Sequence, residues 1–204
     1  MAASPAHSQP SRAGHTADNR RAKRDQIIEA ARDVLARDGV AACTARAVAD
    51  ASPLTKSAIH YYFRDVDEII DQAMAAHVNA MLTSLRDVAG QPAGPHDRLW
   101  AVISAYLATF ADKPHAAFLW FEYWVTASRR HSLDRASQML ADVEALFRGL
   151  LEDMPVDNPG QTAHLLLSWL LGTIVQQHTR PTSAAALHGE LTRILGNRPA
   201  SPHT

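Results

Sequence analysis

Apolar residues recur three and four positions apart along most of this chain, which is the spacing that gives a helix one buried face. The first stripe begins at Ile27 and continues through Ala31 to Leu35. Asp38-Gly39 ends it, because glycine tolerates the left-handed conformation at the end of a helix. No run alternates between apolar and polar residues as a half-buried strand does. The pattern therefore predicts an all-α protein.

Two short helical patterns follow, on either side of a tight break. The first begins at Thr44, whose hydroxyl can accept a hydrogen bond from the start of a helix. It ends at Ser52-Pro53, because proline lacks a backbone donor and disfavours the helical conformation in the residue before it. Thr55 can then cap the second helix. Two short helices joined in this way predict a helix-turn-helix, a layout typical of proteins that read DNA.

The second short helix has two faces of different chemistry. Ala58, Ile59 and Phe63 can point into a core. The opposite face carries side chains with hydrogen-bond donors, namely Lys56, Ser57, His60 and Tyr61. Such donors suit phosphates and base edges, so we expect this face to enter the major groove of DNA.

A long helix is predicted after Phe63. Asp65 and Glu68 have the spacing of a capping box at its start, and Gly90-Gln91-Pro92 marks its end. Five more helical segments follow, most of them bounded by prolines: residues 96–112, 114–129, 131–153, 159–180 and 182–196. The second half is therefore predicted to be one helical domain.

Charge is distributed unevenly along the chain. The formal net charge is −1, but residues through Arg64 include ten Lys and Arg against six Asp and Glu, and the remainder includes ten against fifteen. The basic half is the half that holds the helix-turn-helix. A cluster of Arg20, Arg21, Lys23 and Arg24 lies just ahead of the first stripe. It is either part of a flexible arm that follows DNA phosphates or a solvated tail.

The segment HYYFRDVDEII, together with the upstream segment RRAKRDQIIEAARDVLARDGVAACTARAVADAS, resembles the amino-terminal region of the TetR family of bacterial repressors. The similarity runs from about Arg21 to Met74. It implies a cytoplasmic homodimer that binds a double-stranded DNA operator and is released by a small-molecule effector. The residues expected to contact DNA are Thr44, Arg46, Thr55, Lys56, Ser57, His60, Tyr61, Tyr62 and Arg64.

The same resemblance implies a domain organisation. We expect a disordered arm over residues 1–20, a helix-turn-helix DNA-binding domain over 21–65, a helical domain for ligand binding and dimerisation over 66–197, and a tail over 198–204.

The aromatic residues of the second half are the candidates for an effector site. The segment AAFLWFEYWVTASRR carries more aromatic residues than one core stripe needs, and aromatic side chains from the preceding helix can join them. The candidate residues are Trp100, Tyr106, Phe110, Trp120, Phe121, Glu122 and Trp124. The alternative is that these aromatic residues are ordinary core. Glu122 beside tryptophan faces suits a cationic ligand, and the segment resembles the subgroup that contains the choline-responsive repressor of glycine-betaine synthesis.

The run HLLLSWLLGTIVQQH is apolar around most of its circumference, so another surface must cover it. With the final helix it resembles the helix pair that forms the dimer interface in the family, and Gly172 would permit close approach of two helices. The expected interface residues are Leu166, Trp169, Leu170, Thr173, Leu187, Leu191 and Ile194. The alternative is a central helix of a monomeric bundle.

Several other functions lack support in the sequence. No apolar run approaches the roughly 20 residues of a membrane span, and no histidine pair has the spacing of a metal site. No phosphate loop or catalytic triad pattern appears, so we expect no cofactor and no enzymatic activity. Two rival hypotheses remain: a ligand-binding or enzymatic helical domain with a merely structural helix-turn-helix, and oxidation sensing through Cys43, the only cysteine.

Overall fold

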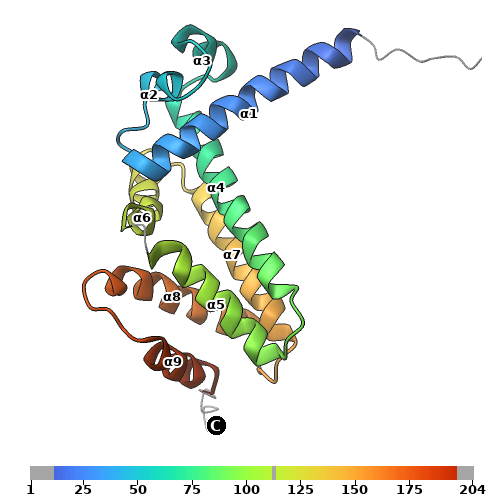
Figure 1. Ribbon diagram of the computed structural model, residues 1–204, viewed down its shortest axis with the longest axis vertical. Coiled ribbons are helices and arrows are strands. Elements are labelled where there is room, and N and C mark those ends of the chain that lie inside the picture. Colours follow the sequence, from blue (N-terminus) through green and yellow to red (C-terminus); the bar gives the residue numbers. More distant parts are fainter. Residues whose placement is uncertain (1–11, 112–113, 197–204) are drawn as a thin grey trace, which may run out of the picture. The chain divides into compact units, whose positions relative to one another are not determined.

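The computed structural model describes residues 12–111 and 114–196, and every regular element in these ranges is a helix. It consists of two compact units that divide between Ala73 and Met74. The helices in chain order are α1 (Arg12–Asp38), α2 (Ala45–Asp50), α3 (Lys56–Tyr62), α4 (Val66–Ala89), α5 (Pro95–Ala111), α6 (Pro114–Arg129), α7 (Asp134–Glu152), α8 (Pro159–Gln177) and α9 (Ala184–Gly196) (Figure 1). The all-α fold predicted from the pattern is confirmed.

The first unit is a small helical head made of α1, α2, α3 and the first turns of α4. Helices α1, α2 and α3 all contact one another, and they bury Val34, Val48 and Ile59 between them. Helices α2 and α3 have six and seven residues, which is too short to be stable in isolation. Their conformation therefore depends on this shared core.

Both short helices are capped as the sequence predicts. Thr44 and Thr55 each accept a hydrogen bond from the backbone N–H three residues later, at 3.1 and 3.2 Å. In the turn between the helices, the Ser52 hydroxyl accepts from the N–H of Leu54 at 3.2 Å. These bonds satisfy backbone donors that the helices leave unpaired, so local sequence determines where α2 and α3 begin.

Helix α1 begins earlier than expected. Residues 12–20 are helical, although the sequence suggested that they belong to a disordered arm. The apolar stripe begins only at Ile27, so periodicity alone missed the earlier start of the helix. Residues 1–11 of the expected arm and residues 197–204, which include the expected tail, lie outside the described residues.

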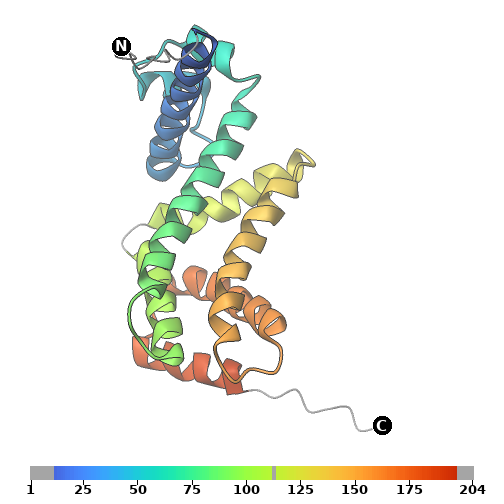
Figure 2. The same ribbon diagram turned by 90° about the vertical axis from the view of Figure 1, so that its right-hand side faces the viewer.

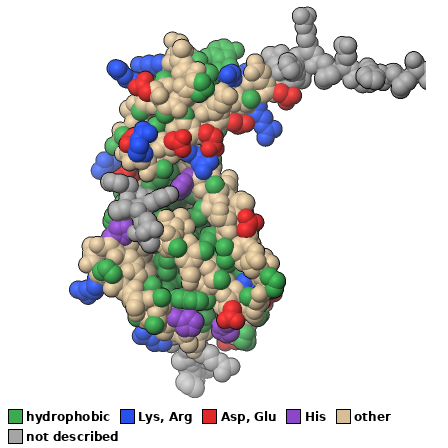
Figure 3. Space-filling view, in the orientation of Figure 1, with side chains coloured by type: hydrophobic (Ala, Val, Ile, Leu, Met, Phe, Trp, Pro, Cys, Tyr) green, Lys and Arg blue, Asp and Glu red, His purple; other side chains and the backbone are tan. Residues whose placement is uncertain are grey.

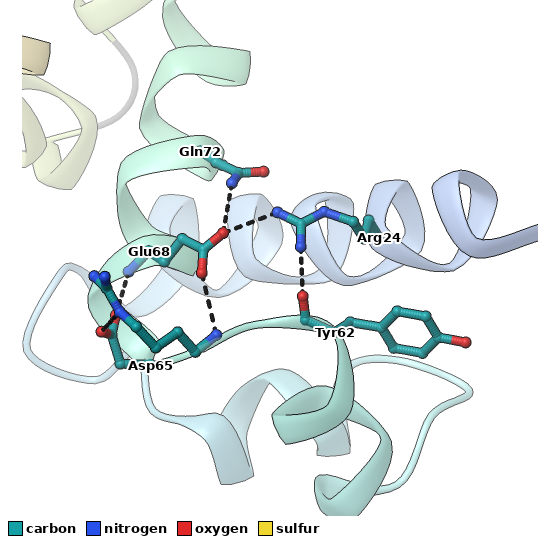
Figure 4. A network of polar contacts seen from close by, with 6 residues as sticks. Arg24, Tyr62, Asp65, Glu68 and Gln72 are labelled. Carbon is teal, nitrogen blue, oxygen red and sulfur yellow. Dashed lines mark hydrogen bonds and ion pairs between the residues drawn. The ribbon is translucent and has the colours of Figure 1, made fainter. Parts of the chain in front are cut away.

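An arginine of α1 ties the end of α3 to the start of α4 (Figure 4). The Arg24 guanidinium donates to the backbone carbonyl of Tyr62 and, at 2.9 Å, to the carboxylate of Glu68. This carboxylate also accepts from the backbone N–H of Arg64 and from the Gln72 amide, each at 3.1 Å. The partly buried carboxylate of Glu68 thus holds α1, the segment after α3 and α4 in a fixed arrangement.

The predicted capping box of α4 is present with one difference. Asp65 accepts from the N–H of Glu68 at 2.8 Å, as expected, but the Glu68 side chain accepts from the N–H of Arg64 instead of that of Asp65. The carboxylate is turned toward Arg24, whose guanidinium also lies 4.1 Å from the centre of the Phe63 ring. The hydrogen bond from Arg24 lowers the pKa of the Glu68 carboxyl below its ordinary value.

The second unit surrounds α8 with other helices. Helix α8 contacts α5, α6, α7 and α9 (Figures 1 and 2). Its Leu166 and Leu170 are fully buried. The bounds of α5 to α9 lie close to the predicted ones, with α7 starting at Asp134 instead of residue 131. Prolines at the first positions of α5, α6 and α8 explain this accuracy, because a missing N–H costs nothing there.

The boundary between the units falls within α4. The sequence placed it between residues 65 and 66, whereas the compact units divide after Ala73. The reason is that Ile69, Ile70 and Ala73 are buried in the first unit, so the first two turns of α4 contribute to that core.

Cys43 lies in the core of the head, just before α2. Burial raises the pKa of its thiol to about 11. Because the thiolate is the reactive form, this cysteine is unsuited to oxidation sensing.

We expect Glu68→Gln to destabilise the head at neutral pH by on the order of 1 kcal/mol, because the charged acceptor for Arg24 is lost. A lowered carboxyl pKa contributes stability that is present above the ordinary value of 4.5 and is lost as pH falls through the lowered one. Urea unfolding should therefore show a difference between wild type and variant that shrinks from pH 7 toward pH 3. Glu29→Gln, which removes an exposed partner of Arg32, is the control. A Glu68→Gln deficit that is equal at both pH values would contradict this assignment.

The Cys43 thiol of the folded protein should not react with a thiol-specific disulfide reagent at pH 7, and it should react fully in concentrated urea. The release of the coloured leaving group measures both. Rapid stoichiometric labelling of the folded protein would show that the thiol is accessible and restore the oxidation hypothesis.

Candidate nucleic-acid interface and internal cavity

The outward face of α3 carries the residues expected to contact base edges. Lys56, Ser57, His60 and Tyr61 are all exposed, and Tyr61 leaves 71% of its surface open. The Tyr61 ring rests edge-on against that of Tyr62 at 5.0 Å. An aromatic ring displayed this openly on a polar face is typical of a surface that binds a partner.

The inward face of α3 anchors the helix. Ile59 and Phe63 are almost completely buried, and Tyr62 is half-buried with its carbonyl bound to Arg24. The outward side chains therefore project from a backbone held on both its packed face and its last turn. A rigid backbone is what reading base edges by hydrogen bonds requires, since those bonds tolerate little displacement.

The other residues predicted to contact DNA lie on the same unit and differ in the hydrogen bonds and ion pairs that their side chains already form. Arg46 on α2 is exposed and lies 3.9 Å from Asp50, an ion pair too long and open to hold it firmly. Arg64 is exposed but donates to Asp65 at 2.8 Å. Thr44 and Thr55 are exposed caps.

The basic cluster ahead of the first stripe is helical and is not a flexible arm. Arg24 is committed to Tyr62 and Glu68, and Lys23 donates to Gln26 at 3.3 Å. Arg20 lies beside the outward face of α3, with its guanidinium 6.0 Å from the centre of the Tyr61 ring. The sequence left Arg24 either in an arm that follows phosphates or in a solvated tail, and it missed this structural role, since no local pattern links α1 to residues about forty positions later.

The second unit encloses a cavity of about 50 Å³. Helices α4 to α8 all contribute to its lining: Met74, His77, Val78, Met81, Tyr106, Phe110, Leu119, Trp120, Phe121, Met139, Leu140, Val143, Leu167, Leu171 and Ile174. Among the described residues that line it there is no Asp, Glu, Lys or Arg. The cavity therefore favours an apolar occupant.

The structure brings together four of the seven predicted effector residues and separates three. Tyr106, Phe110, Trp120 and Phe121 line the cavity. Trp100 does not, because it packs edge-on against His188 of α9 at 4.6 Å. Glu122 and Trp124 do not either, because both are exposed on α6.

The reason for this separation lies in α6 itself. Its aromatic residues occupy more than one face, so helical spacing could not decide which face is inward. Tyr123 is completely buried, and its neighbours Glu122 and Trp124 consequently point elsewhere. Glu122 therefore does not line this cavity, and its pairing with a cationic ligand stays a prediction that the cavity does not support.

Most predicted dimer residues are buried inside the single chain. Leu166, Leu170 and Thr173 of α8 and Leu187 and Leu191 of α9 have almost no exposed surface. Helix α8 is apolar on most sides, and four helices of its own chain contact it. This arrangement corresponds to the alternative in which α8 is a central helix of the bundle. Of the seven residues, only Trp169 and Ile194 are half-exposed.

Within residues 12–111 and 114–196 there is no group of three His, Cys, Asp or Glu placed to hold a metal ion. In the same ranges no helix combines the length and the apolar character needed to cross a membrane.

Sequence comparison relates the head to a known family. Residues 27–73 match the model described as bacterial regulatory proteins, tetR family. The HTH-type transcriptional regulator PksA of Bacillus subtilis (strain 168) is 25% identical over 128 residues, which cover 63% of this chain and 60% of PksA. The match thus spans less than two thirds of that relative.

Solved structures extend the similarity of fold to both units. The transcriptional regulator FadR from Bacillus subtilis in complex with stearoyl-CoA has a TM-score of 0.67 and 16% identity, with 84% of this chain and 97% of that one covered. The multidrug binding protein EbrR complexed with imidazole has a TM-score of 0.64 and 22% identity, with 89% and 98% covered. Residues 27–73 are thus similar to the tetR family of bacterial regulatory proteins, and most of the chain shares the fold of these two solved regulators.

Proposed function

We propose that this protein is a cytoplasmic transcriptional repressor, which binds operator DNA as a homodimer and leaves it when a small apolar molecule enters the second unit. The observation that carries the proposal is the outward face of α3, where four donor-bearing side chains stand exposed on a firmly anchored helix. His60 and Tyr61 would read base edges. Arg46 and Arg20 would contact phosphates, since both lie on the head and neither is held in a short ion pair.

The lining of the cavity supports an apolar effector. A choline-like cation, which the sequence suggested, is best held by a carboxylate together with aromatic faces, and the described lining offers aromatic rings but no carboxylate. The related FadR of Bacillus subtilis is described with stearoyl-CoA, a molecule with a long apolar chain. The chemistry of the lining in this chain agrees with a ligand whose buried portion is hydrocarbon.

The cavity must enlarge to admit such a ligand. Its volume of about 50 Å³ is well below the roughly 300 Å³ at which ligand pockets usually begin. Met74, Met81 and Met139 line it, and methionine side chains repack more easily than branched ones. An effector would therefore select an expanded state of the second unit, and it releases DNA only if that state binds the operator more weakly.

Helix α4 is the element through which we propose that this expansion acts on the head. Its residues Met74, His77, Val78 and Met81 line the cavity, and its first turn carries Glu68. A shift of α4 imposed by the ligand would pull on the carboxylate that holds α3.

The proposed dimer uses the part of α8 that its own chain leaves open. Leu165 is 52% exposed, and Trp169 and Gly172 continue the same side of the helix at spacings of four and three residues. A Cβ added at Gly172 would meet no atom within 4 Å, which leaves room for a partner helix to approach. Hydrophobic side chains gather on the face where α5, α8 and α9 lie (Figure 3). The interface is thus proposed to centre on Leu165, Trp169 and Ile194.

Replacing both His60 and Tyr61 with alanine should weaken binding to the promoter region of the protein's own gene at least tenfold, without lowering the unfolding temperature, because both side chains are exposed. A gel-shift titration measures the binding, and Arg37→Ala on α1 serves as a control that removes an exposed charge elsewhere on the head. Normal protection of the operator by the double variant would refute the assignment of α3 as the reading helix.

Leu165→Glu should convert the dimer into a monomer that remains folded, because a charge at this half-open position is tolerated in one chain and is costly between two. Sedimentation velocity gives the mass, and circular dichroism gives the helix content. Val125→Glu, at a 41% exposed position of α6, is the matched control and should leave the dimer intact. A dimeric Leu165→Glu variant would place the interface elsewhere.

A further inference from the structure

One polar group in the cavity lacks a partner. Tyr106 of α5 lines the cavity and is only 4% exposed. Its ring is held edge-on by Phe110 at 5.3 Å and by Phe147 at 6.0 Å, so packing determines where the hydroxyl points. Among the residues that the structure describes, none forms a hydrogen bond with this hydroxyl.

The Tyr106 hydroxyl is not among the completely enclosed side-chain atoms without a partner, so it keeps some accessible surface, and the cavity is the space that this residue lines. Burial alone raises the pKa of Tyr106, and no neighbouring charge or hydrogen bond contributes. The phenol therefore stays protonated and remains a hydrogen-bond donor throughout the physiological range. A ligand that fills the cavity meets this donor and binds less tightly unless it supplies an acceptor.

The other lining residues limit which kind of hydrogen-bond acceptor the ligand can carry. They include no Lys or Arg, so a carboxylate or phosphate inside the cavity would have no full positive charge beside it. They include no Asp or Glu, so a buried ammonium group would lack a counter-charge as well. His77 is the only other residue of the lining with a strongly polar side chain. A neutral oxygen acceptor is the group that one phenol donor in an apolar cavity can match.

We propose that the effector of this protein is a neutral, mainly apolar molecule with a carbonyl-type oxygen, which accepts a hydrogen bond from the Tyr106 hydroxyl. This proposal rests on the proposed function, since it names the class of the molecule that the repressor senses. The ring of Phe110 and the methionines of the lining enclose the hydrocarbon part. Tyr106 then distinguishes molecules with an acceptor from pure hydrocarbons of the same shape.

The test compares two probe molecules with two variants of the full-length protein. Acetophenone and isopropylbenzene have nearly the same shape, and a carbonyl oxygen in the first replaces a methyl group in the second. Their Kd values would be measured by NMR chemical-shift titration for wild type, Tyr106→Phe and Tyr123→Phe. Tyr123→Phe is the matched control, because Tyr123 is also a buried tyrosine but does not line the cavity.

We expect Tyr106→Phe to weaken acetophenone binding by roughly three- to tenfold, the worth of one neutral hydrogen bond, and to leave isopropylbenzene binding unchanged or slightly tighter. Tyr123→Phe should not change the ratio of the two Kd values. Without any probe, Tyr106→Phe should unfold at the same or a higher temperature, because it removes an unpaired polar group. A lower unfolding temperature would mean that the hydroxyl is already paired, and this would overturn the proposal.

Two further outcomes would also overturn it: equal weakening of both probes by Tyr106→Phe, and wild-type protein that binds neither probe. Operator binding by the ligand-free protein is measured separately, in a gel shift. If operator binding holds while the two probes are not distinguished, this inference fails and the repressor function stands. If the probes are distinguished but no operator is bound, the proposed function fails and the cavity remains a site for neutral carbonyl compounds.

Discussion

The ion pair between Arg24 and Glu68 is the interaction on which the position of α3 and of its outward face depends. Helix α3 is only seven residues long, and its outward face is useful only if its position is fixed. The buried side of the helix supplies Ile59, and Phe63 follows at its end, but apolar packing alone permits some rotation and sliding. The guanidinium of Arg24 and the carboxylate of Glu68 remove that freedom at the last turn, since they bind the Tyr62 carbonyl and the Arg64 N–H.

Glu68 belongs to a helix whose residues are divided between the two units. Glu68 lies in the first turn of α4, and later turns of that continuous helix line the cavity. A small, methionine-rich cavity that must enlarge to accept a ligand is suited to move the helix that lines it. The proposed regulation thus needs no new element: it couples the volume of the cavity to the helix that carries Glu68.

The sequence predicted best those features that local chemistry determines. Thr44, Thr55 and the prolines at helix starts define the helix ends through one or two backbone hydrogen bonds each, so a single sequence suffices to find them. The outward face of α3 was predicted for the same reason, because the short helix has one clearly apolar and one clearly polar side. The sequence did not predict the beginning of α1, which lies ahead of the apolar stripe that starts at Ile27.

Features that depend on tertiary packing were predicted less well. Helices α6 and α8 are apolar on several sides, and the spacing of their residues could not tell whether Trp124 faces a cavity or Leu166 faces a partner chain. The role of Arg24 and the unpaired hydroxyl of Tyr106 both depend on residues distant in sequence, so no motif could have indicated them.

Selection of bound sequences from a random duplex DNA library tests the central claim most directly, namely that the anchored outward face of α3 reads DNA in a paired protein. The account predicts that the full-length protein enriches one motif with two-fold symmetry, whose half-sites lie about one or more helical turns apart. It also predicts that the protein with alanine at positions 60 and 61 enriches none. If the wild-type protein enriched no sequence, or if both proteins enriched the same one, the claim would be contradicted.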